Sequence, residues 1–365
     1  MASRSPGRKI RVLIVDDCAA MRGLLRAVLS RDPGIEVVGE APDPDAARAL
    51  IRSLDPDVLT LDVEMRGTSG LELLEGLMRA CPTPVVMIST LTARGTEVTL
   101  DALALGAVDC FARPTHNVAA HLDGAAQELI AKVRGAASAK VRPFMRAASV
   151  PSAPRCFDDR IIAVGASTGG VEAVAQLLSH FPANCPPTLV ALHMPAGFTA
   201  SFAARLDRLC APHVDQAVDG APLTPGQVWL VPDGGAHLEV GGRTNPRCRL
   251  TDGPVGGHRG SVDRMFHSLA RHCARKAVGV ILTGTGRDGA DGLGALASAG
   301  GQTVGQDEAS SVVYGMPRAA FETGAVLHQL PLEKIGPFVL DLCLSLPPAE
   351  QMQDCHANEE AKATA

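Results

Sequence analysis

The chain of 365 residues is long enough for about two domains, and hydrophobic residues make up 46% of it, which suits sizeable cores. Its formal net charge is −5, and it shows no basic stripe or recognition helix, so we do not expect it to bind nucleic acid. The ten cysteines form no C-x-x-C pair, and there is neither a signal peptide nor an apolar run of about 18 residues; we therefore expect a cytoplasmic monomer with free thiols and no direct membrane insertion.

The first part of the chain alternates strand-like and helix-like segments. Strand-like runs occur at Ile10–Val15, Ile35–Gly39, Val58–Leu61, Val85–Ser89 and Val108–Phe111. Helix-like periodicity lies between and after them, at Met21–Leu29, Asp45–Leu54, Gly70–Ala80, Glu97–Leu105 and Gln127–Val133. This alternation predicts an α/β domain over residues 8–135 with a doubly wound, flavodoxin-like parallel sheet.

A second α/β pattern follows a segment rich in Ala, Ser, Pro and Arg, which predicts a linker over residues 136–159. Short, turn-separated strand patterns between Val214 and Thr251 indicate an antiparallel excursion. We expect a Rossmann-like parallel sheet over residues 160–346 and a disordered tail over 347–365. The strands expected in this second domain lie at Ile161–Gly165, Thr188–Leu192, Val228–Val231, Val278–Leu282 and Gln302–Val304. Its expected helices include Ser261–Arg275 and Gly289–Ala299.

Three acidic residues of the first domain come directly after strand-like runs. Asp16 and Asp17 follow the first run, and Asp62 follows the third. The carboxyl ends of parallel strands meet at one edge of the sheet, where three carboxylates would repel one another without a cation. Mg²⁺ prefers such hard oxygen ligands, and a carboxylate beside it can accept a phosphoryl group. The alternative is that these residues are ordinary helix N-caps.

This region resembles the response-regulator receiver family through VLIVDDCAAMR (Val12–Arg22), LDVEM (Leu61–Met65), VMIST (Val86–Thr90) and GAVDCFARP (Gly106–Pro114). The resemblance implies that Asp62 is phosphorylated by a histidine kinase and that Ser89 hydrogen-bonds the phosphoryl group. It also implies that Mg²⁺ is held by Asp16, Asp17, Asp62 and the backbone carbonyl of Glu64.

The sequence departs from the receiver pattern at three places. Arg113 stands where the family has lysine, Cys110 stands where it has the switch aromatic, and the loop after Asp62 reads MRGTSG. Arginine keeps the positive charge but is larger and planar. Cysteine cannot act as a bulky rotamer switch, so a receiver regulated without phosphate stays as an alternative.

The second domain opens with a serine motif. IIAVGASTGG (Ile161–Gly170) fits G-x-S-x-G and places Ser167 directly after a buried strand. The N–H groups of the following helix would point at the same place and could stabilise an oxyanion. The alternative is a glycine-rich phosphate-binding turn.

A base and an orienting acid are available for this serine. His193 closes the next strand and should lie at the same sheet edge as Ser167, unless it is only a packed strand cap. Asp288 follows a later strand closely, with Asp291 as its rival in the same loop and helix capping as its simpler role. The order Ser, His, Asp differs from that of the α/β-hydrolases, which argues against that fold.

Residues 160–345 closely resemble the catalytic domain of the chemotaxis protein-glutamate methylesterases, the CheB family. The motifs are IIAVGASTGGVEAV (Ile161–Val174), LHMPAGFTASFAARLD (Leu192–Asp207), GHRGSVDRMFHSLA (Gly257–Ala270), GVILTGTGRDGADG (Gly279–Gly292) and QDEASSVVYGMPRAA (Gln306–Ala320). The resemblance implies a cofactor-free serine hydrolase that demethylates glutamate methyl esters, and deamidates glutamines, on methyl-accepting chemotaxis receptors. It implies Ser167 as nucleophile, His193 as base and Asp288 as orienting acid.

The same resemblance implies that the backbone N–H groups of Thr168 and Thr285 face the oxyanion. It also implies that the receiver docks over the catalytic cleft until phosphorylation opens it.

Two other hypotheses are weaker. A signalling adaptor that keeps the fold but only binds would fit the altered receiver, although an intact Ser167, His193 and Asp288 argues against it. A nucleotide-binding oxidoreductase would need G-x-G-x-x-G, and Ser167 fills the second glycine position.

Overall fold

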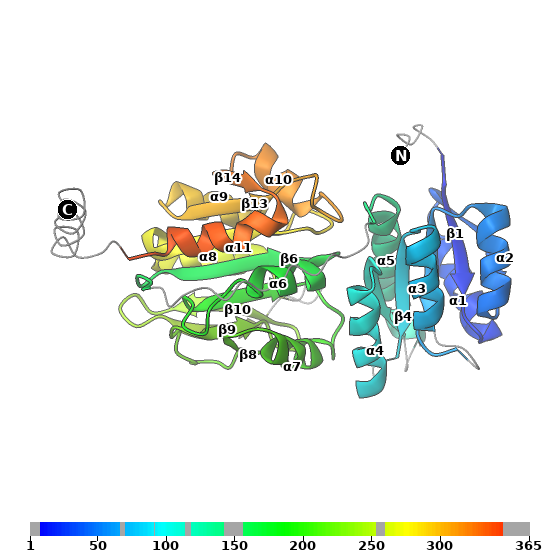
Figure 1. Cartoon of the computed structure of the whole chain (residues 1–365), viewed down its shortest axis with the longest axis horizontal. Coiled ribbons are helices and arrows are strands. Elements are labelled where there is room, and N and C mark those ends of the chain that lie inside the picture. The colour runs from blue at the N-terminus through cyan, green and yellow to red at the C-terminus, as the bar shows by residue number, and fades with distance from the viewer. Residues whose placement is uncertain are drawn as a thin grey trace, which may run out of the picture.

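The computed structural model describes residues 8–65, 70–90, 92–113, 118–141, 156–252 and 260–345. They form two α/β domains that lie side by side (Figure 1). The loop MRGTSG, apart from its first and last residues, most of the predicted linker and the predicted tail lie outside the described residues.

The N-terminal domain is a parallel five-stranded sheet in the order β2-β1-β3-β4-β5, as the alternation of patterns predicts. Residues of β1 alternate between its faces. Val12 and Ile14 pack with α1 and α5, whereas Leu13 and Val15 pack with α2, α3 and α4. The elements are β1 (Ile10–Val15), α1 (Ala19–Leu29), β2 (Ile35–Ala41), α2 (Pro44–Leu54), β3 (Val58–Asp62), α3 (Gly70–Ala80), β4 (Val85–Ser89), α4 (Ala93–Ala104), β5 (Asp109–Ala112) and α5 (Val118–Ala137).

The C-terminal domain is built on a parallel seven-stranded sheet in the order β14-β13-β12-β6-β7-β9-β8. Helices α6, α7 and α11 pack on one face, and α8, α9, α10 and the β10–β11 hairpin pack on the other. The elements are β6 (Ile161–Ala166), α6 (Gly170–Leu178), β7 (Thr188–Leu192), α7 (Thr199–Leu209), β8 (His213–Gln216), β9 (Gln227–Leu230), β10 (Ala236–Gly241), β11 (Arg247–Asp252), α8 (Val262–His272), the short 3₁₀ helix η1 (Ala274–Lys276), β12 (Ala277–Ile281), α9 (Ala290–Ser298), β13 (Gln302–Gln306), α10 (Met316–Glu322), β14 (His328–Leu330) and α11 (Leu332–Leu342).

The predicted antiparallel excursion is confirmed for part of its range. Strands β10 and β11 pair antiparallel in a sheet of their own. Strands β8 and β9, in contrast, pair parallel to each other and extend the main sheet beyond β7. The short apolar runs in this region do not distinguish the two kinds of pairing, because both are compatible with strands of four residues.

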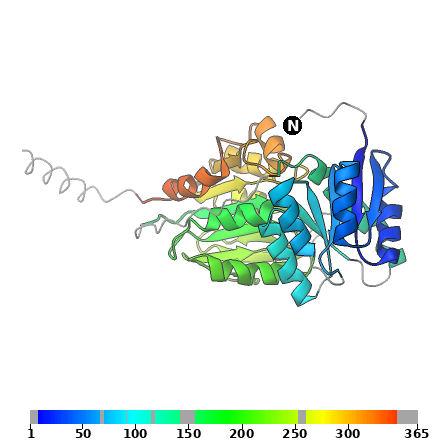
Figure 2. The same cartoon turned by 45° about the vertical axis from the view of Figure 1, so that its right-hand side comes forward.

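The receiver-like domain and the C-terminal domain share a buried interface. Helix α4 packs against α6 and α7. In Figure 2 the cyan helices of the receiver-like domain lie beside the green helices of the C-terminal domain. One hydrophobic cluster runs through both domains and includes Leu103 and Cys110 on one side and Val171 and Val174 on the other. Helix α5 ends at Ala137, inside the predicted linker, and Lys140 N then donates to Val312 O over 3.0 Å.

Candidate functional site

The three candidate catalytic residues follow three neighbouring strands of the seven-stranded sheet. Ser167 comes directly after β6, His193 directly after β7, and Asp288 lies in the loop between β12 and α9. Strand β6 lies between β12 and β7, and the chain leaves β6 towards β7 and returns to its other side at β12. Such a reversal of strand order opens a crevice at the carboxyl edge of a parallel sheet, which is where these residues meet.

The turn at Ser167 is held by backbone bonds and by glycine. Ser167 N donates to Thr283 O over 3.0 Å, and Gly170 N donates to Ser167 O over 2.7 Å. Gly169, the N-cap of α6, has a φ of 77°, a left-handed conformation that glycine adopts without steric cost. A Cβ on Gly284 would lie 2.8 Å from Ser167 Cβ, so the loop after β12 can approach the serine only because residue 284 is glycine.

His193 and Asp288 form a hydrogen-bonded pair. His193 Nε2 lies 2.9 Å from Asp288 Oδ2, and their side chains are 16% and 11% exposed. Burial alone would raise the pKa of Asp288. The hydrogen bond and charge of His193, together with the N–H groups of Asp263 and Val262, nevertheless hold that pKa well below the usual range. The acid is therefore ionised at neutral pH, as an orienting carboxylate must be.

The rival acid of the same loop lies outside this arrangement. Asp291 is exposed and accepts a hydrogen bond of 2.9 Å from Arg287, one turn away along the chain. The structure thus brings Asp288, and not Asp291, together with His193.

The two candidate oxyanion residues adjoin each other. The hydroxyl oxygens of Thr168 and Thr285 lie 3.4 Å apart, and Thr168 O accepts from the Thr283 hydroxyl over 3.0 Å. The side chain of Thr168 is directed at the other domain, where its hydroxyl donates to Asp109 Oδ2 over 2.6 Å.

Ser167 and His193 line a cavity whose opposite wall belongs to the receiver-like domain. The catalytic-domain wall includes Val171, Glu172 and Met194. The receiver-like wall comprises Leu103, Gly106, Ala107, Val108, Asp109 and Cys110. A protein substrate could not reach Ser167 through this cavity without displacing that wall.

Direct bonds hold the two walls together. Gly169 N donates to Val108 O over 3.2 Å, and the Asp109 carboxylate accepts from Thr168 and pairs with Lys132 Nζ at 2.7 Å. The sequence patterns did not single out Asp109 or Lys132, because an acid in a strand and a lysine in a helix carry no signal of a contact between domains.

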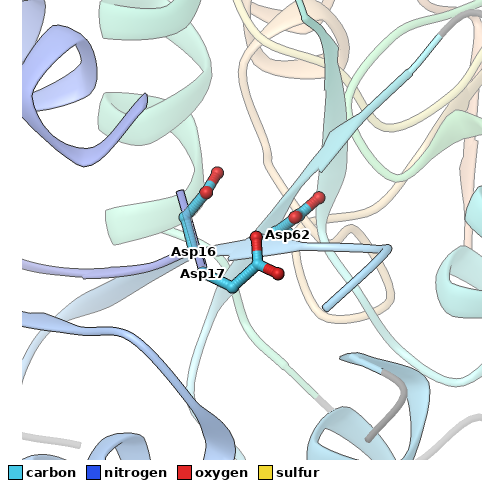
Figure 3. Close-up of side chains that lie close together, drawn as sticks. All are labelled: Asp16, Asp17 and Asp62. Carbon is cyan, nitrogen blue, oxygen red and sulfur yellow. The ribbon is translucent and has the colours of Figure 1, made fainter. Parts of the chain in front are cut away.

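The acidic cluster of the receiver-like domain is formed as the strand ends predict. Oxygen atoms of Asp16, Asp17 and Asp62 all lie within 4.8 Å of one another, and Figure 3 shows the three side chains close together. Burial raises the pKa of Asp62 to about 6, against the lowering effect of Arg113. Three neighbouring carboxylates, of which Asp16 and Asp62 are buried, fit Mg²⁺, because a divalent cation would offset their repulsion.

Of the altered receiver positions, Arg113 lies beside this cluster. Arg113 Nη2 lies 2.7 Å from Asp16 Oδ2 and 2.6 Å from Asp62 Oδ2, so its single positive charge faces both acids, as that of a lysine could. Ser89 is turned towards α4, where its hydroxyl contacts Gly95 O at 3.2 Å and accepts from Thr99 over 2.6 Å. Glu64 N faces Asp62 Oδ1 at 3.3 Å. Cys110 is buried at the domain interface rather than in a position where a side chain could turn outward.

The N-terminal end of helix α8 makes further contacts to Asp288, the partner of His193. Asp288 accepts from the Ser261 hydroxyl and from the N–H groups of Val262 and Asp263, at 3.0, 2.9 and 3.0 Å. The sequence predicted this helix but not its docking on Asp288, because the contact joins segments that are distant along the chain.

None of the helices in the part of the chain that the structure describes has the length and apolar character needed to cross a membrane.

Comparison with known proteins agrees with this architecture. The model of the response regulator receiver domain matches residues 12–121, and the CheB methylesterase model matches residues 162–339. The chain is 55% identical over 339 residues to protein-glutamate methylesterase/protein-glutamine glutaminase 1 of Caulobacter vibrioides, covering 92% of this chain and 98% of that protein. It is 51% identical over 337 residues to the protein-glutamate methylesterase/protein-glutamine glutaminase of Agrobacterium fabrum, covering 91% of this chain and 96% of that protein. The chain therefore belongs to the CheB methylesterase family, with a response regulator receiver domain at its N-terminus.

Proposed function

We propose that the chain is a receiver-regulated serine hydrolase that converts glutamate methyl esters on chemotaxis receptors into glutamate and methanol, and glutamines into glutamate and ammonia. The observation that carries the proposal is the His193–Asp288 pair at 2.9 Å, on loops that adjoin Ser167 at one edge of the sheet. The names of relatives that share about half of its residues along nearly their whole length support the same activity.

The reaction follows from the roles of these three residues. Nε2 of His193 is bonded to Asp288, so Nδ1 would take the Ser167 proton during the reaction. Ser167 Oγ attacks the ester carbon, and the imidazolium returns its proton to the departing methoxide, which leaves as methanol. Water, activated by the same nitrogen, then hydrolyses the glutamyl-serine ester. Asp288 stays ionised and stabilises the imidazolium in both halves.

The negative oxygen of each tetrahedral intermediate needs donors beside Ser167. We assign this role to the backbone N–H groups of Thr168 and Thr285, whose side chains adjoin at 3.4 Å. Thr168 precedes α6, so the positive end of that helix also stabilises a negative oxygen placed at the Thr168 N–H. A backbone donor does not depend on the side chain at position 285.

The receiver controls access to this site. In the arrangement described here, Val108 and Asp109 bond to the segment that follows Ser167, and the receiver forms one wall of the cavity. A histidine kinase would phosphorylate Asp62. Asp16, Asp17, Asp62 and the Glu64 carbonyl would hold Mg²⁺, whose charge offsets that of the phosphoryl oxygens. Ser89 would leave Gly95 O to bond the phosphoryl group, which frees α4 to shift at the interface.

A non-catalytic adaptor is the less favoured alternative. An adaptor has no need of a largely buried, ionised carboxylate bonded to a histidine beside a serine at the N-terminus of a helix.

Replacement of the nucleophile tests the proposal. Ser167→Ala should lower the rate of ester hydrolysis by on the order of 10⁴–10⁶, because the acyl-enzyme can no longer form. The measurement is turnover on methylated receptor membranes, with covalent labelling by a fluorophosphonate in parallel. Ser179→Ala is a suitable control, since Ser179 Oγ donates only to Gln176 O, over 2.7 Å, at the end of α6. Turnover by the Ser167→Ala protein close to that of the unmodified chain would remove the nucleophile assignment.

A further inference from the structure

The carboxylate of Asp288 is hydrogen-bonded by the first turn of α8. Asp288 Oδ1 accepts from the Ser261 hydroxyl over 3.0 Å and from Asp263 N over 3.0 Å, and Oδ2 accepts from Val262 N over 2.9 Å. Only Oδ2 also faces His193, at 2.9 Å. The three donors of α8 therefore fix the plane of the carboxylate, and with it the direction from which His193 is held.

Ser261 is itself held in place on two sides. Its N–H donates to Nδ1 of the buried His237 over 3.0 Å, and its hydroxyl oxygen accepts from Arg264 N over 3.4 Å as the N-cap of α8. A serine hydroxyl has one proton and can accept at the same time, so it can cap the helix and still donate to Asp288. A side chain without a hydroxyl would lose both bonds.

The first helical residue of α8 links the acid to the nucleophile. A Cβ on Gly165, in strand β6 directly before Ser167, would lie 2.2 Å from Val262 Cγ1. A Cβ on Gly289, directly after Asp288, would lie 2.6 Å from the same atom. Val262 thus fits between strand β6 and the loop of Asp288 only because residues 165 and 289 are glycine. The close packing fixes the position of α8, which contacts Asp288, relative to the strand that leads to Ser167.

We infer that Ser261 is a positioning residue of the hydrolase, which orients the Asp288 carboxylate through its hydroxyl and through the first turn of α8. It touches neither substrate nor the reacting atoms, and it acts through Asp288 on the direction of the His193 imidazole. The inference deepens the proposed function, on which its kinetic test rests.

The kinetic test compares three variants of the full-length chain in the presence of a small phosphodonor. Ser261→Ala should lower kcat for methanol release about 10- to 100-fold, the effect of losing one hydrogen bond to a charged group, with KM within about twofold. Ser261→Thr keeps the hydroxyl and should recover kcat to within about threefold of the unmodified chain. Ser268→Ala is the matched control. It removes a buried hydroxyl of the same helix that bonds only to Met265 O and Val240 N, so it should lower thermal stability and leave kcat within about twofold.

A second measurement needs no substrate. The His193 proton shared with Asp288 should give a downfield imidazole N–H signal in proton NMR of chain labelled with ¹⁵N-histidine, assigned by its loss in His193→Gln. We expect the signal to be lost or strongly broadened in Ser261→Ala and kept in Ser261→Thr and Ser268→Ala. Its persistence in a folded Ser261→Ala protein, or a kcat for that protein within twofold of the unmodified chain, would overturn the positioning role. Absence of methanol release by the unmodified chain, with the signal still dependent on Ser261, would instead count against the proposed substrate.

Discussion

Asp109 makes the side-chain hydrogen bond between the receiver and the segment after Ser167, next to the backbone bond of Val108. It is 8% exposed, bonded to Thr168 at 2.6 Å on the catalytic domain and to Lys132 at 2.7 Å on its own domain. A charge-assisted hydrogen bond at a buried site contributes more than an exposed ion pair. Asp109 should therefore favour the closed arrangement more than the other polar contacts of the interface do.

The isosteric change Asp109→Asn tests this role. An amide oxygen can still accept from Lys132, whereas the amide nitrogen would replace the oxygen to which Thr168 donates. We expect esterase activity without phosphodonor to rise about threefold to tenfold, because about 1 kcal/mol of the closed arrangement is lost. The control is Asp101→Asn, which removes the exposed pair with Arg205 at 2.6 Å and should change the rate less than twofold. Equal effects of the two changes would show that Asp109 has no special part.

Single residues also mark where sequence inference ends. The placement of Ser167, His193 and Asp288 at one edge of the sheet was predictable, because each follows a strand and the order of apolar runs already gives the strands. Asp109 and Ser261 were not, since their roles arise only when one domain packs on another or one helix docks on a loop. The sequence favoured Asp288 over Asp291, and the contact of Asp288 with His193 supports that choice.

Helix α5 approaches the catalytic domain at a glycine. A Cβ on Gly135 would lie 2.5 Å from Thr285 Cγ2 and 4.0 Å from Thr168 Oγ1. A large side chain at this position cannot be accommodated while the domains are closed.

Gly135→Leu should therefore separate the domains and raise activity without phosphodonor, up to the level that the phosphodonor gives the unmodified chain. The matched control is Gly124→Leu in the same helix, where a Cβ would meet nothing within 4 Å. Both changes raise helix propensity alike, so only the contact with Thr285 distinguishes them. Steady-state turnover of the two variants, with and without phosphodonor, is the measurement. A Gly135→Leu protein that stays as inactive as its control would contradict an occluding receiver.

A second contact of α5 fixes it to the turn after α1. Arg134 donates to both oxygens of Asp32 at 2.6 Å, and the hydrogen bonds from Arg134 lower the pKa of that acid. A group whose pKa is depressed on folding contributes stability above its unfolded pKa and loses that contribution as the pH falls through its folded value. Asp32→Asn should reduce the free energy of unfolding by about 0.5–1 kcal/mol at pH 7 and by much less at pH 3. Urea unfolding at the two pH values measures this, and an undiminished difference at pH 3 would exclude the ion pair as the cause.

Most elements follow from local patterns, and the exceptions have physical reasons. Helix α4 begins at Ala93, before the predicted Glu97, because the Thr92 side chain caps it by accepting from Gly95 N over 3.0 Å. Strand β8 pairs parallel to β9 at the sheet edge. Its four residues do not specify this direction, whereas its packing against α7 favours it. Helices α7, α10 and α11 and strand β14 were not predicted. Helix α10 and strand β14 have only 7 and 3 residues, and Pro337 lies inside α11, where proline argues against a helix.

At the scale of the whole molecule, the candidate phosphorylation site and the candidate hydrolase site lie in two domains that share one interface. The acids of the first site lie at the carboxyl ends of β1 and β3, and Ser89 at the end of β4 bonds to α4, which packs on α6 and α7 (Figure 1). A movement of Ser89 towards Asp62 would break its bond to α4 and so change the packing of α4 at the interface that covers Ser167. Arg113 already pairs with Asp62, so its charge is available to a phosphoryl group there.

The most direct test of the account is methanol release from methylated chemoreceptor membranes by the purified full-length chain, with and without a small phosphodonor, beside Ser167→Ala. We predict slow release without phosphodonor, a clear rise with it, and none above background from Ser167→Ala. Release that the phosphodonor leaves unchanged would contradict control through Asp62, and an absence of release under both conditions would contradict the hydrolase itself.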